Sequence, residues 1–408
     1  MKKTYDVIVV GAGPSGSTAA RYIAAIGFKV LVLEKEKLGW EKACGGGIPG
    51  RAISEFGIPD KVFDRMIYGG LISSPKCVTV VIEKPYRTGA CTMRGRFDRI
   101  LCEMAVEEGA QFREGSKVIG PIFKGQNLVG VRSMEKGEMC EYRAKVIVVA
   151  DGYPSNMARK LGVHIGDPRA IFVGYQHNMK LKNSEIDKKI NNRIELYGSD
   201  HFPGGYAWIF PKNGLVSVGI AIPLYIIKQE RINLKKRLES FIKDHPLVKD
   251  KLRKAEILFS QGAQIPYGGL GNDKFKIVTK IYGNGYVIVG DAAGFVSPLT
   301  GEGIYYGMKS AELAAEVVGE ALKADDFSGR RLIEYYRKVR ESIIYGDMKA
   351  GWKIKRMFDK HIEKIVRASN ENPWFREING KLFAGEIPYP EYLKALYLHP
   401  FKLVKILL

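Results

Sequence analysis

In the first forty residues, apolar runs alternate with short glycine-containing segments. Residues 6–10 form a short apolar run typical of a buried parallel strand. Residues 11–16 are rich in glycine, residues 17–25 favour a helix that ends at Gly27, and residues 30–33 are again apolar. The pattern predicts a strand, a tight turn, a helix and a second strand, which ends at Glu34.

Two later apolar runs predict further parallel strands of the same kind. Residues 145–150 end at Asp151, and residues 286–289 end at Gly290 and Asp291. Acids at the carboxyl ends of such strands lie where open α/β sheets bind ligands. Residues 298–304 then begin a long helix, whose glycine-rich start offers N–H groups to an electron-rich ligand atom.

A helix is also predicted from about residue 94 to Gly109. Phe97, Leu101 and Met104 share one face, which indicates packing. Arg94 stands just ahead of this face, where we expect it to reach a phosphate or a ring system.

From about residue 171 to residue 265 the chain is rich in β-forming residues with an alternating pattern. We expect a mostly antiparallel sheet, inserted into the first domain. Tyr206, Trp208 and Phe210 share one side of a strand because side chains alternate along it. This stripe is either an ordinary core stripe or the wall of a ligand site.

The stretch from residue 42 to residue 49 contains Cys44 followed by three glycines. Three consecutive glycines argue against a helix or an ordinary strand. A backbone without side chains suits close contact with a flat ligand, which Cys44 would then also touch. The alternative is a flexible loop with an incidental cysteine.

Residues 321–408 read as helical and carry an excess of basic residues. Trp352, Ile354, Phe358, Ile362 and Ile365 form an apolar face flanked by lysine and arginine. A basic amphipathic helix binds an anionic bilayer or packs on its own domain, and both interpretations stay open.

Composition narrows the classes of function. The 408 residues carry a formal net charge of +20, which suits nucleic acid, an anionic membrane surface, an anionic substrate or simply a solvated lysine-rich surface. No helix-turn-helix, zinc-finger or RNA-binding signature is present, so we expect no nucleic-acid partner. No apolar run is long enough to span a membrane, and because the first strand begins within a few residues of the N-terminus we expect no targeting peptide. The five cysteines include no CxxC pair, which favours reduced thiols in a cytoplasm and no metal site.

The glycine-rich turn has a specific chemistry. Gly11 permits the tight turn, Gly13 lets the backbone approach a pyrophosphate, and Gly16 lets the helix pack closely on the sheet. Glu34 is positioned to accept hydrogen bonds from a ribose diol. The agreement of strand, turn, helix and acid predicts a bound dinucleotide.

Taken together, these motifs resemble the geranylgeranyl reductase family of flavoproteins, which has the p-hydroxybenzoate hydroxylase fold. The resemblance rests on residues 11–16 with Glu34, on residues 94–98, on Gly290 with Asp291, and on residues 298–303. Residues 42–49 resemble the cysteine–glycine loop of prenyl reductases, and residues 203–211 resemble the YxWxFP substrate motif. The distal GxG of that motif reads Gly219-Ile220-Ala221 here, a mild departure.

The resemblance implies an α/β fold: a Rossmann-type FAD-binding domain, an inserted, mostly antiparallel β-sheet substrate domain and a helical C-terminal region. We predict a discontinuous FAD-binding domain at 1–73, 94–168 and 268–320, a substrate domain at 74–93 and 169–267, and the helical region at 321–408.

The resemblance also implies site residues. Cys44 is the predicted catalytic residue, and Tyr206, Trp208 and Phe210 would bind substrate. The predicted FAD contacts are Gly11, Gly13, Pro14, Ser15, Gly16, Glu34, Cys44, Gly45, Gly46, Gly47, Arg94, Val118, Asp151, Gly290, Asp291, Gly301, Gly303 and Ile304.

The function we expect is FAD-dependent saturation of double bonds in the geranylgeranyl chains of an archaeal-type membrane lipid. The electron donor would be NAD(P)H or reduced ferredoxin. The expected location is the cytoplasm, with a peripheral position on the anionic inner face of the cell membrane left open. For the same reaction, the substrate could instead be geranylgeranyl diphosphate, a chlorophyll precursor or menaquinone. Four alternative functions remain: an aromatic hydroxylase, a flavin halogenase, a quinone-linked electron carrier and a prenyl-binding chaperone of the same fold.

Overall fold

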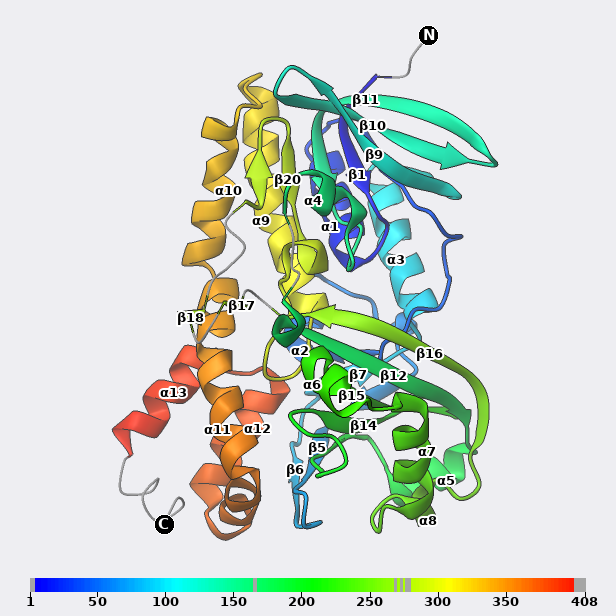
Figure 1. Ribbon diagram of the computed structural model, residues 1–408, viewed down its shortest axis with the longest axis vertical. Coiled ribbons are helices and arrows are strands. Elements are labelled where there is room, and N and C mark those ends of the chain that lie inside the picture. The colour runs from blue at the N-terminus through cyan, green and yellow to red at the C-terminus, as the bar shows by residue number, and fades with distance from the viewer. Residues whose placement is uncertain (1–3, 164–166, 268–269, 272–273, 276–279, 400–408) are drawn as a thin grey trace. The chain divides into compact units, whose positions relative to one another are not determined.

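A computed structural model describes residues 4–163, 167–267, 270–271, 274–275 and 280–399 (Figure 1). The chain divides into two compact units. Unit 1 comprises residues 1–40, 95–167 and 266–348, and unit 2 comprises residues 41–94, 168–265 and 349–408.

Unit 1 is built on an eight-stranded sheet with a parallel centre. In spatial order the strands are β19 (Tyr282–Gly283), β20 (Tyr286–Ile288), β11 (Glu138–Val149), β1 (Thr4–Val10), β2 (Val30–Leu33) and β8 (Gln111–Arg113). The long β11 continues past this path and pairs antiparallel with β10 (Asn127–Glu135), which pairs with β9 (Ser116–Lys124). The predicted parallel strands are confirmed: Val7 pairs with Val146 on one side and with Val30 on the other.

Helices cover this sheet because its central strands are apolar on both faces. They are α1 (Pro14–Ala25), α3 (Arg94–Glu107), α4 (Asn156–Lys160), α9 (Ile304–Lys323) and α10 (Gly329–Glu341). The small residues of α1 let it pack closely on α9, and the two helices lie side by side in Figure 1.

Unit 2 contains a seven-stranded sheet. Its spatial order is β16 (Glu256–Pro266), β12 (Ile171–Lys180), β15 (Leu215–Pro223), β14 (Tyr206–Pro211), β13 (Arg193–Tyr197), β5 (Gly69–Ser73) and β6 (Thr79–Glu83). The pairs β12–β15, β15–β14, β14–β13 and β5–β6 are antiparallel and the pair β13–β5 is parallel, so the mostly antiparallel sheet is confirmed. The predicted boundary at residue 73 differs from this arrangement, because β5 is a strand of this sheet.

One face of this sheet is the core of unit 2. Leu71, Tyr197, Ile209, Val218 and Ile220 pack there against Leu238 and Phe241. The covering helices are α5 (Asn183–Lys189), α6 (Leu224–Glu230), α7 (Leu234–Asp244) and α8 (Lys249–Leu252). Since Tyr206, Trp208 and Phe210 alternate with the core residues of β14, they belong to the opposite face.

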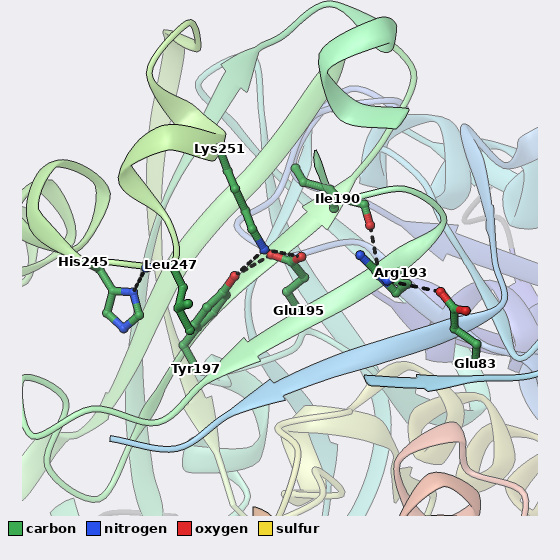
Figure 2. Close-up of polar contacts among 8 residues, drawn as sticks. All are labelled: Glu83, Ile190, Arg193, Glu195, Tyr197, His245, Leu247 and Lys251. Carbon is green, nitrogen blue, oxygen red and sulfur yellow. Dashed lines mark hydrogen bonds and ion pairs between the residues drawn. The ribbon is translucent and has the colours of Figure 1, made fainter. Parts of the chain in front are cut away.

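A buried polar network fastens α8 to β13 on the core face (Figure 2). Glu195 is fully buried, and its Oε1 accepts a hydrogen bond from Lys251 Nζ at 2.7 Å. The Tyr197 hydroxyl donates to the Glu195 carboxylate at 2.5 Å and accepts from Lys251 at 3.1 Å. The ammonium of Lys251 therefore balances the negative charge of the buried Glu195 carboxylate.

A small sheet in unit 2 carries the glycine stretch. Its strands are β3 (Gly47–Pro49), β7 (Gly89–Cys91) and β4 (Arg65–Ile67). The expectation that all three glycines lie outside strands is wrong for Gly47, which pairs with Cys91. A short three-residue strand tolerates a glycine because neighbouring side chains need not pack on it.

The C-terminal part is helical, as predicted. Besides α10 it contains α11 (Ile343–Glu371), α12 (Pro373–Ala384) and α13 (Tyr389–Leu398). The apolar face of α11 is partly buried, with Ile354, Phe358 and Ile365 no more than 7% exposed, which favours packing over a free amphipathic face. Remaining short elements are α2 (Gly50–Glu55), the turns η1 (Asp60–Val62), η2 (Pro168–Ala170) and η3 (Gly290–Ala293), and the pair β17 (Leu270–Gly271) and β18 (Lys274–Phe275). Within the described residues, no helix has both the length and the apolar character needed to cross a membrane.

Candidate active site

The first part of the site in unit 1 is the turn between β1 and α1. Gly11 has a φ of +99°, and a Cβ there would lie 2.4 Å from the carbonyl oxygen of Ala150. A Cβ at Gly16 would lie 1.9 Å from the Gly11 carbonyl oxygen. In the described part of the chain no side chain caps α1, which begins after Gly13 with Pro14. The open helix N-terminus and the bare turn fit a pyrophosphate.

Glu34 lies at the end of β2 and is 7% exposed. Its Oε2 accepts a hydrogen bond from the Ala12 N–H at 2.7 Å, and its Oε1 accepts one from the Glu36 N–H at 3.0 Å. A carboxylate has about four acceptor positions, so these two bonds orient Glu34 and leave capacity for ribose hydroxyls.

A second open helix start lies at α9. Gly303 precedes α9, and no side chain caps this helix in the described residues. A Cβ at Gly303 would meet Asp291 Oδ1 at 2.9 Å, so the carboxylate of Asp291 lies beside this helix start. The loop before it turns at Gly301, whose φ is +72° and whose N–H donates to the Ser297 carbonyl at 3.0 Å.

Ser15 ties these two parts of unit 1 together. Hypothetical Cβ atoms at Gly290 and Gly307 would lie 2.2 Å and 2.4 Å from Ser15 Oγ. The side chain of Ser15 therefore fills the contact between α1, η3 and α9. Its predicted contact with FAD would use its backbone N–H.

Asp151 has a local structural role. Its carboxylate accepts hydrogen bonds from the Ser155 hydroxyl and from the Met157 N–H, the latter at 3.0 Å, at the start of α4. Burial raises the pKa of Asp151, although these hydrogen bonds oppose the shift. Val118 lies in β9, and Arg94 is the first residue of α3. The FAD contacts of these three residues stay predictions.

In unit 2 the glycines lie directly against the predicted aromatic stripe. A Cβ at Gly45 would lie 2.7 Å from Phe210 Cδ2 and 3.2 Å from Trp208 Nε1, and one at Gly47 would lie 2.9 Å from Phe210 Cε2. We call residues 42–47 the cysteine–glycine loop. Only glycine fits at these positions, because the aromatic rings occupy the space of a side chain.

Cys44 precedes this contact and is partly exposed. Its Sγ accepts a hydrogen bond from the Gly46 N–H at 3.4 Å. Burial raises the pKa of the Tyr206 hydroxyl, and the charge of an ionised Cys44 would raise it further. The structure thus brings together Cys44 with the glycines, and the glycines with Trp208 and Phe210, within unit 2.

The contacts of several residues of this face were not predicted. Lys212, only 1% exposed, donates to the Gly45 carbonyl at 2.7 Å. Gly219 on β15 makes room for Trp208, since a Cβ there would lie 2.2 Å from Trp208 Cζ2. Gln176 Oε1 and Trp208 Nε1 are buried with no hydrogen-bond partner among the described residues. For Lys212 the only signal in the sequence was its position directly after the motif, which does not reveal its burial, whereas Gly219 stood in the sequence as the first glycine of the distal GxG.

The sequence is similar to known FAD-binding proteins. The FAD binding domain family model matches residues 4–345. The digeranylgeranylglycerophospholipid reductase of Thermoplasma volcanium is 31% identical over 408 residues, which covers 97% of this chain and 99% of that protein. The protein of that name from Methanocaldococcus jannaschii is 32% identical, with 91% of this chain and 92% of that protein covered.

Solved structures agree. A crystal structure of a geranylgeranyl bacteriochlorophyll reductase-like protein from Thermoplasma acidophilum has a TM-score of 0.82 and 27% identity, covering 97% of this chain and 99% of that one. A flavin-dependent brominase has a TM-score of 0.76 at 22% identity, covering 98% of this chain and 100% of that one, which reflects the shared fold alone. The open helix starts, the bare glycine turn and Glu34 fit FAD.

Proposed function

Because the chain belongs to the digeranylgeranylglycerophospholipid reductase family of FAD-binding proteins, we propose that it saturates carbon–carbon double bonds in the geranylgeranyl chains of an archaeal-type membrane lipid. The observation that carries the proposal within unit 2 is the packing of Gly45 and Gly47 on Phe210 and Trp208. This packing joins a cysteine to an aromatic surface suited to an isoprenoid chain.

FAD, when bound and reduced, supplies the hydride for such a reduction. We propose that the phosphates bind at the start of α1 and that Glu34 holds the adenosine ribose. Asp291 and the start of α9, with Gly303 and Ile304, would hold the flavin end. The support is the absence of side-chain caps on both helices within the described residues, together with the glycines at both sites.

The aromatic residues have two proposed tasks. An isolated alkene accepts hydride poorly, so the site must exclude water and stabilise positive charge that develops as a proton arrives. The rings of Tyr206, Trp208 and Phe210 provide apolar surface and electron-rich faces for this purpose. Tyr206 and Trp208 lie with ring centroids 6.0 Å apart and planes tilted by 54°, which leaves each ring a separate face.

Cys44 is the residue we propose at the reacting carbons. An ordinary thiol has a pKa of about 8.5 and is a weak acid for an alkene, so its task is to orient the double bond or to pass on a proton. The hydrogen bond from the Gly46 N–H to Sγ supports a fixed orientation of the thiol.

Cysteine variants test this assignment. We expect Cys44→Ala and Cys44→Ser to keep FAD but to lose turnover, by about 10²–10⁴-fold if the thiol transfers a proton. Cys140→Ala is the matched control, because Cys140 lies on β11 in unit 1. Full activity in both Cys44 variants would remove this residue from the mechanism.

The finer assignments need their own tests. We propose NAD(P)H or reduced ferredoxin as the electron donor, and anaerobic bleaching of the flavin by each donor distinguishes them.

We also propose that the protein works at an anionic membrane surface, supported by its formal charge of +20. Sedimentation with anionic vesicles but not with neutral ones is the expected result.

A further inference from the structure

Lys212 is a fully buried lysine next to the cysteine–glycine loop. It follows Pro211, the last residue of β14, and only 1% of it is exposed. Its Nζ donates to the Gly45 carbonyl at 2.7 Å and to Ser217 Oγ at 2.6 Å. Ser217 in turn donates to Asn178 Oδ1 at 2.5 Å. The ammonium is therefore held at a fixed point between two strands and the loop.

The direct hydrogen-bond partners of this ammonium are uncharged. Among the described residues, the polar contacts of Lys212 are with the Gly45 carbonyl and Ser217, and Asp64 and Glu41 act on it through longer-range attraction. Burial lowers the pKa of Lys212; an ionised Cys91 or Cys44 would oppose this shift, as the charges of Asp64 and Glu41 do. A buried charge without an ion-pair partner costs stability. Its presence beside the loop points to a task other than stability.

The loop is held at two successive carbonyls. Lys212 binds the Gly45 carbonyl, and the Thr92 N–H donates to the Gly46 carbonyl at 2.9 Å. A Cβ at Gly46 would lie 2.0 Å from the Thr92 carbonyl oxygen and 3.2 Å from Lys212 Cε. Gly45 and Gly47 of the loop also lie against the ring of Phe210. The peptide that follows Cys44 therefore has little freedom while Lys212 is in place.

We propose that Lys212 is a positioning residue, whose bond to the Gly45 carbonyl fixes the cysteine–glycine loop so that the thiol of Cys44 is presented to the substrate in one orientation. This inference rests on the proposed role of Cys44. Without the ammonium, the Gly45 carbonyl would lose its buried donor, and the loop would move to find another. A displacement of about 1 Å in a reacting group lowers turnover by about 10²-fold.

The main test replaces Lys212 by methionine, which keeps the unbranched chain and removes the charge and the donor. We expect kcat with the lipid substrate to fall by about 10–100-fold while KM changes less than about threefold, since the aromatic face remains. The alkylation rate of Cys44 by iodoacetamide, measured on the cysteine-containing peptide by mass spectrometry, should rise several-fold because the loop is released. FAD content should match that of the unaltered protein.

Lys251→Met is the matched control. It makes the same substitution at a largely buried lysine of unit 2 whose partners, Glu195 and Tyr197, lie on the core face. We expect this variant to lose stability but to keep kcat per bound FAD and the alkylation rate of Cys44. An equal loss of kcat in both lysine variants would overturn the proposal, as would a folded Lys212→Met protein with unchanged kcat and alkylation.

The Ser217→Ala variant and the alkylation measurement test the proposal even if Lys212→Met does not fold or the proposed reaction is wrong. Ser217→Ala keeps the lysine but removes its second acceptor, and we expect a smaller fall in kcat, about two- to fivefold. If Lys212→Met does not fold, unchanged kcat and alkylation in Ser217→Ala overturn the proposal. The alkylation measurement needs no turnover, so a failure of the proposed reaction is distinguishable from a failure of this inference.

Discussion

Gly219→Ala tests whether the position of Trp208 matters for the reaction. Gly219 pairs with Trp208 across β15 and β14, and the indole lies over it. The new Cβ would lie 2.2 Å from Trp208 Cζ2 and 2.6 Å from Cε2. Since ordinary contacts begin near 3.4 Å, the indole would have to move by about 1 Å.

The indole has little room for this movement. Trp208 is 7% exposed, and its Nε1 edge faces Gly45 on the other side. Overpacking of this kind costs about 1–3 kcal/mol. For a unit of roughly 150–250 residues this lowers Tm by about 2–12 °C. Because the moved ring presses on Gly45, we also expect kcat to fall by about tenfold or more.

Thermal unfolding followed by circular dichroism, tryptophan emission and product analysis measure these effects together. Gly70→Ala is the matched control: it is a strand glycine in the same sheet, and its Cβ would lie at ordinary contact distances, 3.4 Å from the Ile194 carbonyl oxygen and 3.7 Å from Ile194 Cγ1. We expect a near-normal Tm and activity for Gly70→Ala. A Gly219→Ala protein with the same Tm, emission and kcat as the unaltered protein would refute the reasoning.

Three further predictions follow from contacts within each unit. In α9, Gly307→Ala should weaken FAD binding about tenfold, because the new Cβ would lie 2.4 Å from Ser15 Oγ. The control Gly319→Ala would meet only the end of the flexible Ile26 side chain and should bind FAD normally in a fluorescence titration. Equal FAD affinities of the two variants would contradict this prediction. In the network of Figure 2, Lys251→Met leaves the buried Glu195 carboxylate without its positive partner, so the free energy of unfolding measured in urea should fall by about 3–5 kcal/mol. The control Lys254→Met removes an exposed lysine and should lower this free energy by less than about 1 kcal/mol. Similar losses in both variants would show that burial of the ion pair is not the cause. Burial lowers the pKa of His177 and His245 below the ordinary value of 6.5. Below about pH 6.5 the unfolded chain therefore binds more protons at these histidines than the folded chain does, and the free energy of unfolding should fall as the pH drops. His177→Gln and His245→Gln together should flatten this fall, and an unchanged pH dependence would argue against it.

Much of unit 1 could be predicted because its signals are local. A buried parallel strand is a continuous apolar run, and the turn before α1 needs glycine at fixed positions. The predicted strands and helix starts around residues 6–34 and 286–304 are confirmed for this reason. The roles of single residues were less predictable: the carboxylate of Asp151 accepts hydrogen bonds at the start of α4, which depends on how Ser155 and Met157 are placed against it.

In unit 2 the decisive contacts join residues far apart in the sequence. The packing of Gly45 on Phe210 and the strand pairing of residues 69–73 with residues 193–197 depend on sheet order, which no local pattern encodes. Lys212 illustrates the limit most clearly. A lysine near the end of a strand is ordinarily exposed, and only the fold shows that Gly45 and Ser217 enclose this one.

The most direct test of the central claim is a single-turnover experiment. FAD-loaded protein is reduced anaerobically with dithionite, freed of excess reductant and mixed with digeranylgeranylglycerophospholipid, and the product is analysed by mass spectrometry. We predict a mass gain of two hydrogens for each flavin that is reoxidised, and a smaller yield with geranylgeranyl diphosphate. Protein that is yellow and bleaches on reduction, yet leaves the mass of both lipids unchanged, would contradict the account.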